Sequence, residues 1–312
     1  MSRAMTIDEQ TSEFGGKPVK DYDPQAGLPE AASTAYRIAI GWDRYENNET
    51  APDVFASLVQ DPQAAQLTAL IFGDWGGTAE GKTSEPIVGA LVAAADKLPN
   101  LTALFLGDMT FEECECSWIN HGDVSALYGA FPRLEELRVR GSTGLSLGRV
   151  KHVNIRRLTI ESGGLDVGVV RSVVAAELPN LEHLELWLGD DGYGWNGRVG
   201  DLMPLLTEAR FPKLKYLGLR NSQIADEIAQ AAASSPILPS LDMLDLSLGT
   251  MTDAAVEALA SSTAIRSLKT LDVHRNYLSD AGVARLRKLG VGLIADDQQV
   301  AEDGDRYVAV SE

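Results

Sequence analysis

The segment FEECECSWINH, residues 111–121, gathers residue types that bind metals or act as nucleophiles. Cys114 and Cys116 stand one residue apart, and His121 follows them closely. A structural zinc site takes four ligands, usually with two or more residues between its paired cysteines. A nucleophilic cysteine needs a base and a positive setting, whereas the neighbouring glutamates disfavour a thiolate. We therefore predict that the two cysteines are small packing residues in a loop, with no metal, no cofactor and no catalytic residue.

Two histidine–carboxylate pairs offer acid–base chemistry. His183 with Glu185, and His274 with Asp272, are each two residues apart. That spacing puts both side chains of a pair on the same face of a strand. Such a pair can transfer a proton in a hydrolase-type enzyme. Charged side chains that alternate along a solvated strand produce the same pairs without chemistry, so a non-catalytic protein is the first hypothesis and a hydrolase-type enzyme the alternative.

The composition narrows the class of partner. The 312 residues carry a formal net charge of −18, and 45% of them are hydrophobic. Non-specific binding of nucleic acid depends on clustered Lys and Arg, so we predict no nucleic-acid partner. No stretch approaches the roughly 18 apolar residues of a membrane span, and the N-terminus lacks the apolar core of a signal peptide. These features predict a cytoplasmic protein without membrane contact.

A short apolar pattern recurs along the chain and indicates the elements that position these residues. An apolar anchor is followed by apolar residues three and five positions later. The last two point to the same side of a strand, because side chains alternate with period two. Phrases such as LPNL and FPKL introduce several copies, and their proline ends the preceding helix. The copies are Leu67/Leu70/Phe72, Leu101/Leu104/Leu106, Leu134/Leu137/Val139, Ile155/Leu158/Ile160, Leu181/Leu184/Leu186, Leu214/Leu217/Leu219, Leu241/Leu244/Leu246 and Leu268/Leu271/Val273.

Helical segments are predicted after the strands. Residues 252–262 begin with Thr252 or Asp253 as N-cap and continue with apolar residues at helical spacing. Residues 279–290 repeat this arrangement and end at a glycine. Repeated strands and helices require right-handed crossovers into one parallel sheet. The other predicted helices are 51–60, 84–98, 123–130, 165–177, 200–209 and 224–234, whereas the short repeat 134–154 has no room for one.

With these repeats the chain resembles the leucine-rich repeat family in its ribonuclease-inhibitor-like form. The best copies are LKYLGLRNSQIADEIAQAAASS, LDMLDLSLGTMTDAAVEALASS and LKTLDVHRNYLSDAGVARLRKLG, in which Ile224, Met251 and Leu278 take a further apolar position of that family. LWLGDDGYGW and DGDRYVAVSE are similar to an uncharacterised group of bacterial cytosolic members. The resemblance implies an α/β fold: a curved, right-handed βα solenoid with a parallel sheet on its concave face and helices on its convex face.

The two ends of the chain differ from the repeats. Residues 1–33 are polar and weakly periodic, and we expect them to be partly disordered, with KPVKDY (17–22) docked on the fold. Each repeat buries only its neighbours, so the array needs covered ends. We expect an N-terminal cap at 34–64 with a strand at 36–40, about eight repeats at 65–290, and a C-terminal cap at 291–312.

The outward side chains of the strands are the predicted functional surface. They lie two, four and six residues after each anchor, and they include aromatic residues and arginines, which are enriched in interface hot spots. Solenoids present this surface as a broad concave site. We predict that a protein partner contacts Phe105, Arg138, Arg157, His183, Glu185, Trp187, Tyr193, Trp195, Tyr216, Arg220, Met243 and His274.

The loop 188–200 lengthens one repeat and carries two of these residues. Its glycines permit turns with positive φ, and Tyr193 and Trp195 are costly to expose without purpose. Either the loop touches the partner, or Trp195 packs on the neighbouring loop 73–77 and seals the rim. The sequence thus predicts a monomeric interaction scaffold that uses the sheet and this loop. A structural role in an operon-encoded complex is a further alternative.

Overall fold

The computed structural model describes residue 7 and residues 9–311. The chain divides into two compact units, one up to Leu158 and one from Thr159 to Ser311, which we call unit 1 and unit 2. Strand β7 (Arg157–Glu161) begins in the first and ends in the second. In both units parallel strands alternate with helices, so the predicted α/β leucine-rich repeat fold is confirmed.

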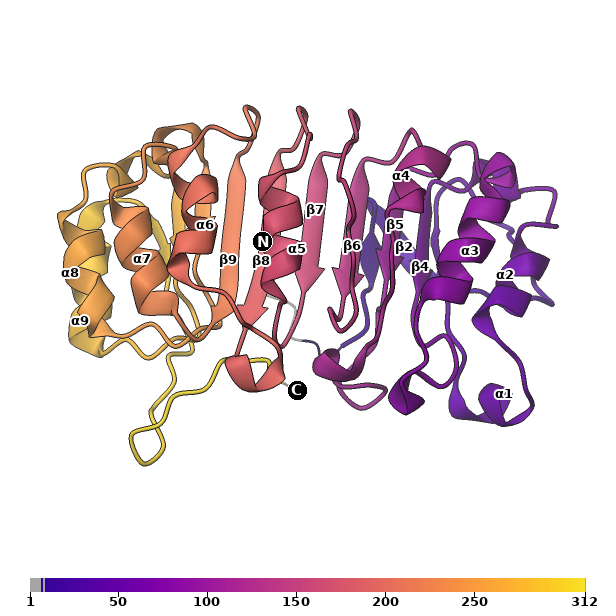
Figure 1. The fold of residues 1–312 in the computed structure, drawn as a ribbon, viewed down its shortest axis with the longest axis horizontal. Coiled ribbons are helices and arrows are strands. Elements are labelled where there is room, and N and C mark those ends of the chain that lie inside the picture. Colours follow the sequence, from indigo (N-terminus) through magenta and orange to yellow (C-terminus); the bar gives the residue numbers. More distant parts are fainter. Residues whose placement is uncertain (1–6, 8, 312) are drawn as a thin grey trace. The chain divides into compact units, whose positions relative to one another are not determined.

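Unit 1 is built on a sheet whose strands pair in chain order. β1 and β2 are antiparallel, and every later pairing through β6 is parallel. Helices pack along one face of this sheet, on the near side in Figure 1. The strands are β1 (Glu13–Phe14), β2 (Lys17–Asp21), β3 (Ala35–Ile38), β4 (Ala69–Phe72), β5 (Ala103–Leu106) and β6 (Glu136–Arg140). The helices are α1 (Trp42–Glu46), α2 (Ala51–Leu58), α3 (Glu85–Ala93) and α4 (Ala126–Ala130).

Unit 2 repeats this arrangement with longer and more regular helices. Its strands from β8 onwards are all parallel to their neighbours. The strands are β8 (His183–Gly189), β9 (Tyr216–Ser222), β10 (Met243–Asp245), β11 (Thr270–Asp272) and β12 (Gly292–Ile294). The helices are α5 (Val167–Val174), α6 (Val199–Thr207), α7 (Ala225–Ala233), α8 (Asp253–Ser261) and α9 (Asp280–Leu286).

Short 3-10 helices complete the connections between these elements. They are η1 (Ala64–Gln66), η2 (Thr78–Glu80), η3 (Ala95–Lys97), η4 (Cys116–Trp118), η5 (Asp191–Tyr193), η6 (Leu238–Ser240), η7 (Ile265–Ser267) and η8 (Arg287–Leu289). No helix is assigned at 141–156, as the short repeat predicted. Among the described residues, no helix has both the length and the apolar character needed to cross a membrane.

The repeat pattern places its apolar residues in the core, as predicted. Leu184, Leu217, Leu244 and Leu271 are all fully buried and lie side by side across four strands. Helix ends also follow the sequence signals, since the Thr252 side chain accepts a hydrogen bond from the Ala254 amide at the start of α8. Register is therefore fixed by burial: a one-residue slip would turn this leucine row to the opposite face.

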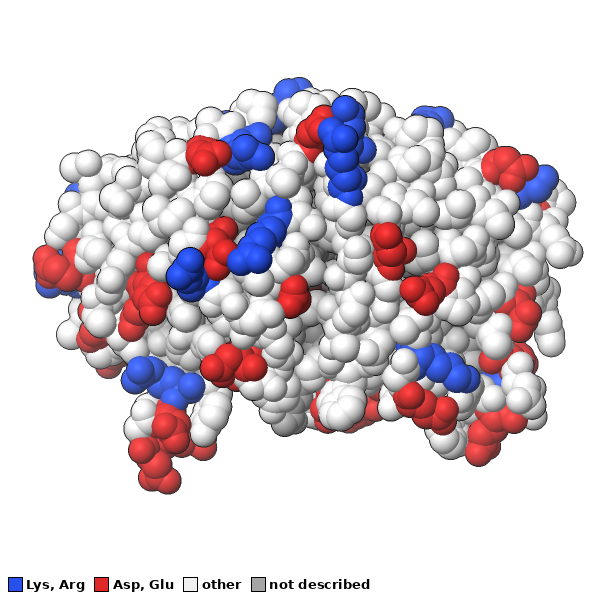
Figure 2. All heavy atoms as spheres, in the orientation of Figure 1, with Lys and Arg blue, Asp and Glu red and all other residues white. Residues whose placement is uncertain are grey.

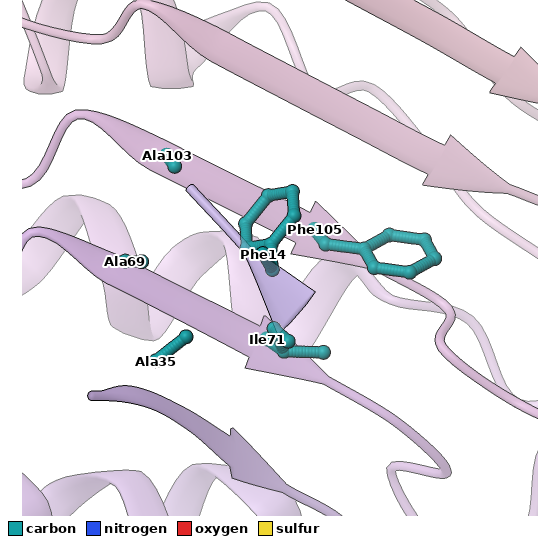
Figure 3. Close-up of a cluster of buried hydrophobic side chains, with 6 residues drawn as sticks. All are labelled: Phe14, Ala35, Ala69, Ile71, Ala103 and Phe105. Carbon is teal, nitrogen blue, oxygen red and sulfur yellow. The ribbon is translucent and has the colours of Figure 1, made fainter. Parts of the chain in front are cut away.

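The N-terminal segment is more ordered than the sequence predicted. We expected partial disorder across 1–33 with 17–22 docked: β2 forms in that docked stretch, β1 forms as well, and residues 1–6 and 8 lie outside the described part. Phe14 packs on the sheet face opposite the helices, with ring centroids 5.8 Å from Phe105, and Figure 3 shows the buried cluster around it. Gly15 has φ +57°, and a Cβ there would lie about 3 Å from the Cβ atoms of Ala69 and Ala103. The segment is ordered because Ala69 and Ala103, small residues of the sheet, let its backbone pack closely against the sheet.

The C-terminal segment follows the strand ends of unit 2. The Ala309 amide donates to the Leu248 carbonyl, and the Val310 amide donates to Oδ1 of Asn221 at 2.9 Å. Leu248 and Asn221 both have positive φ, which turns their backbone at equivalent places in successive repeats. The preceding segment, 296–305, is acidic and projects beside α9, where Figure 2 shows clustered red side chains. Within the predicted C-terminal cap, β12 forms at Gly292–Ile294, whereas 306–310 docks without forming a strand.

Candidate functional site

The side chains that face away from the helices form aligned rows in unit 2. Strands β8 to β11 pair in parallel, so residues at equivalent positions stand next to each other. We call His183, Tyr216, Met243 and Thr270 the outer row. All four are half-buried, so each presents part of its side chain to solvent. The outer row therefore presents two aromatic rings, a thioether and a hydroxyl side by side.

The outer row is held in a fixed geometry by stacking. The rings of His183 and Tyr216 are parallel, with an interplanar angle of 7° and centroids 3.9 Å apart. Tyr216 extends across Gly218, where a Cβ would lie 3.0 Å from the Tyr216 ring. Its hydroxyl then donates to Asp245 at 2.7 Å. Glycine at 218 therefore allows the tyrosine to lie against the sheet.

Beneath the outer row lies a buried group of charges, which we call the ionic cluster: Glu185, Arg220 and Asp245. Arg220 is 2.6 Å from Glu185 and 3.3 Å from Asp245, and its Nε also donates to the Ser247 hydroxyl at 2.9 Å. Each of the three charged residues is less than a tenth exposed. Burial works against ionisation of both acids, whereas the contact with Arg220 favours it.

The two carboxyl groups of the cluster differ in proton affinity. Burial tends to raise the pKa of Glu185, but Arg220 and the hydrogen bonds from His183 and Trp187 lower it well below its usual range. Burial also acts on Asp245, and there the nearby carboxylates add to it, so that the pKa of Asp245 is raised despite Arg220. The shorter contact of Arg220 with Glu185 is consistent with this difference. Glu185 is the ionised partner of the guanidinium.

Trp187 belongs to this cluster rather than to the surface. Its indole Nε1 donates to Glu185 at 2.7 Å, and the Arg220 guanidinium lies 5.0 Å from the ring centroid. The residue is 2% exposed. The sequence correctly placed Trp187 on this strand face but wrongly expected it to be open to a partner. Arg220 was expected to be open as well, and it is equally enclosed.

Both predicted histidine–carboxylate pairs exist. His183 Nε2 lies 3.2 Å from Glu185, and His274 Nδ1 lies 2.7 Å from Asp272. The second pair is buried, with His274 4% exposed. A carboxylate only accepts hydrogen bonds, so Nδ1 of His274 donates to Asp272. The other nitrogen, Nε2, is buried and has no hydrogen-bond partner among the described residues.

The predicted contact residues of unit 1 do not form a comparable surface. Phe105 is fully buried under Phe14, so the expectation that it is open to a partner is wrong. Arg138 lies over the Phe105 ring, 4.3 Å from its centroid, and is half-buried. Arg157 in β7 is exposed. The N-terminal segment thus occupies the face that the sequence assigned to a partner.

The loop 188–200 packs against its own unit. Trp195 is 2% exposed, and its ring adjoins Val167 and Gly197. The Trp195 amide donates to the Asp190 carbonyl, which closes the loop on itself. Tyr193 keeps 36% of its surface exposed. Of the two aromatic residues predicted to meet a partner, only Tyr193 is presented to solvent.

Both cysteines of the segment 111–121 are enclosed in the fold. Cys114 and Cys116 are buried, and burial raises the pKa of the Cys114 thiol to about 12, with nearby acidic groups adding to it. His121 contacts Ser84 at 2.9 Å and the Arg140 carbonyl at 2.8 Å. The described residues bring no three His, Cys, Asp or Glu side chains together in a metal-binding arrangement.

Two short sequence patterns also match catalytic motifs. Residues 76–83, GGTAEGKT, match the phosphate-binding loop of nucleotide-binding proteins, and residues 144–148, GLSLG, match the G-x-S-x-G pattern of hydrolases. In the first, the amides of Glu80 and Lys82 donate to the Gly77 carbonyl, so both amides are already hydrogen-bonded within the loop. The second requires a turn from strand into helix, and no helix follows it. Neither segment has the geometry of its motif.

Three residues of the site were absent from the predicted contact set. Thr270 belongs to the outer row, while Asp245 and Ser247 contact Arg220. All three occupy outward positions of their repeats, so the period-two rule that found Tyr216 and Arg220 applies to them equally. Selection by residue type, which favoured aromatic residues and arginine, is what excluded them.

Comparisons with known proteins identify similar solved structures, and none of them assigns a function to this chain. No protein-family model matches the chain, and no curated protein sequence does. A crystal structure of a protein from Bacteroides fragilis is 33% identical, with a TM-score of 0.79; the match covers 84% of this chain and 74% of that chain. An internalin from Listeria monocytogenes matches at 15% identity and a TM-score of 0.40, covering 80% of this chain and 57% of that chain.

Proposed function

We propose that this chain, which belongs to the same family as the Bacteroides fragilis protein, is a non-catalytic interaction scaffold, because repeat solenoids present broad binding surfaces. Its partner is a protein, which it binds through the outer row of unit 2, with Tyr193 of the loop 188–200 at the margin. The proposed protein is a cytoplasmic monomer that uses no cofactor. Its net charge of −18 favours a protein over a nucleic acid.

One observation carries this proposal: the outer row is half-exposed and in register, and it lies over a buried ionic cluster. Tyr216 and His183 are fixed by stacking and by hydrogen bonds to Asp245 and Glu185. Side chains that are already ordered lose little entropy on binding, and tyrosine is enriched in hot spots. Met243 adds an adaptable apolar contact beside them. A rigid aromatic anchor next to a flexible thioether suits a protein surface.

In unit 1 a sheet face of the same kind already binds an extended segment of the chain. In that segment Phe14 packs on Phe105, and the side chain and amide of Thr11 donate to Asp108. The sheet face of this fold can therefore hold a peptide chain through one aromatic anchor and a few polar contacts. In unit 2 the outer row is the place where a second protein can make equivalent contacts.

The test compares two methionines. Met243→Lys puts a positive charge into the outer row, whereas Met203→Lys puts it on helix α6, where Met203 is also half-buried. Both variants and the wild type are immobilised and used to capture proteins from a lysate of the source cells, followed by mass spectrometry. We expect a protein captured by the wild type and by Met203→Lys, with at least tenfold loss on Met243→Lys. Equal capture by both variants would move the site away from the outer row.

A further inference from the structure

The charges under the outer row are not balanced. Glu185, Asp245 and Asp272 are three buried carboxyl groups on neighbouring strands, and Arg220 is the guanidinium that contacts the first two. Asp272 has a hydrogen bond from the His274 amide at 3.0 Å and the contact with Nδ1 of His274. The ion-pair partner of Asp272 among the described residues is His274, which is a counter-charge only when protonated, and no Lys or Arg side chain pairs with Asp272. A buried carboxylate without a permanent counter-charge is costly, so this face favours an added cation.

The proton affinity of Asp245 reflects the same imbalance. After burial, which Arg220 opposes, the neighbouring Asp272 and Glu185 raise the pKa of Asp245 further. A carboxyl group that is kept from ionising by its acidic neighbours is one that a nearby positive charge would stabilise in its ionised form. The cation would therefore be bound more tightly than by an isolated surface carboxylate.

A second, independent feature points to a hydrogen-bond donor. Nε2 of His274 is buried without a partner in the described part of the chain, and the residue is 4% exposed. With the Nδ1 proton directed at Asp272, Nε2 is the acceptor in the uncharged tautomer of the ring. A buried acceptor without a hydrogen-bond partner is destabilising. A ligand that carries several N–H donors and a positive charge satisfies both this nitrogen and Asp272.

We propose that the unit 2 face recognises its partner through an arginine side chain, which enters beside Met243 and Thr270 to reach Asp272 and Nε2 of His274. This inference rests on the proposed function and specifies the chemistry of the partner. A guanidinium is planar, is always charged and presents five N–H donors. Met243 is unbranched, so its side chain can move aside to admit the group.

The experiment uses two pools of random octapeptides that differ at one fixed central residue. One pool carries arginine and the other carries citrulline, which has nearly the same shape but no charge. Each pool is passed over immobilised full-length protein, and the retained peptides are quantified by mass spectrometry. We expect at least tenfold greater retention of the arginine pool by the wild type. Equal retention of the two pools would overturn the proposal.

Substitutions at Asp272 and Met243 test where the preference for the arginine pool arises. Asp272→Asn should remove the preference for arginine, whereas Asp242→Asn, at a half-buried aspartate that pairs with Lys269, should keep it. Met243→Arg provides a second route that does not depend on Asp272→Asn folding. It places a guanidinium of the protein itself next to the carboxyl groups, so it should abolish the preference and raise the melting temperature, unlike Met203→Arg. An arginine preference that survives in both Asp272→Asn and Met243→Arg would refute the assignment.

The outcomes separate this inference from the proposed function. If Met243→Lys loses a captured protein but the two peptide pools bind alike, the interaction surface stands and the cationic partner is wrong. If neither capture nor peptide retention responds to changes in the outer row, both are wrong.

Discussion

Unit 1 buries a histidine in its neutral form, and this should make the protein less stable in mild acid. His121 is 2% exposed, and burial lowers its pKa from 6.5 to about 4, although its hydrogen bond to the Arg140 carbonyl acts in the opposite direction. A carbonyl only accepts, so Nε2 must donate to Arg140, and Nδ1 of the neutral ring then accepts from the Ser84 hydroxyl. Both contacts are made without a second proton on the ring.

The pH dependence follows from the direction of this shift. The folded pKa lies below the unfolded value, so the unfolded chain binds more protons between about pH 6.5 and pH 4. The contribution of His121 is therefore fully present above pH 6.5 and is lost as the pH falls towards 4. A folded pKa near 4 corresponds to a loss of about 2 kcal/mol between pH 7 and pH 5, and about 3 kcal/mol by pH 4.

The assay is urea unfolding at pH 7, 6 and 5, followed by circular dichroism, for the wild type and two variants. His121→Gln removes the titrating ring, so its difference from the wild type should shrink by about 2 kcal/mol from pH 7 to pH 5. Leu127→Ala is the control, because it removes a fully buried side chain of α4 without changing a titrating group. Its difference from the wild type should be constant. A His121→Gln difference that is also constant would refute the assignment of a buried neutral ring.

Three further changes test the core and the loops. Leu244→Ala should cost about 2–5 kcal/mol in urea unfolding, because Leu244 is fully buried, and a loss below about 0.5 kcal/mol would show that the strand register is wrong. Cys114→Ser combined with Cys116→Ser should leave the circular dichroism spectrum and metal content unchanged, and stoichiometric zinc lost in the double variant would contradict this. Gly189→Ala should lower the melting temperature, since φ is +77° and the added Cβ would stand 1.8 Å from the carbonyl oxygen of Gly163; a melting temperature equal to that of the wild type would contradict it.

The sequence was sufficient to predict the repeats because their signal is local. Spacing of Leu241, Leu244 and Leu246 reports which side chains share a strand face, and the turn residues report where strands end. The fold class, the strand order and the absence of a helix at 141–156 all follow from such short-range patterns. None of them depends on which distant residues meet.

The burial of the outward side chains could not be predicted in this way. The period-two rule placed Phe105 and Trp187 on the correct face, yet both are enclosed. Phe105 is covered by Phe14, which comes from far away in the sequence, and Trp187 is covered through contacts with Glu185 and Arg220 on two strands. Adjacent strands lie about 4.8 Å apart, so large side chains in neighbouring registers shield each other. That shielding depends on partners and side-chain conformations, which no repeat pattern specifies.

The burial of Arg220 changes the effect that we expect from its substitution. As an exposed contact, Arg220 would be removable without loss of stability, but the structure makes it the counter-charge of Glu185 and Asp245. Arg220→Met should therefore cost about 3–5 kcal/mol in urea unfolding, because it leaves buried acids without their partner. Arg157→Met, at an exposed position, should cost less than about 0.5 kcal/mol. Adding Glu185→Gln and Asp245→Asn to Arg220→Met should recover part of the loss, since no uncompensated charge then remains buried. If Arg220→Met is as stable as Arg157→Met, the ionic cluster does not hold the outer row, and the physical basis for the proposed binding surface fails with it.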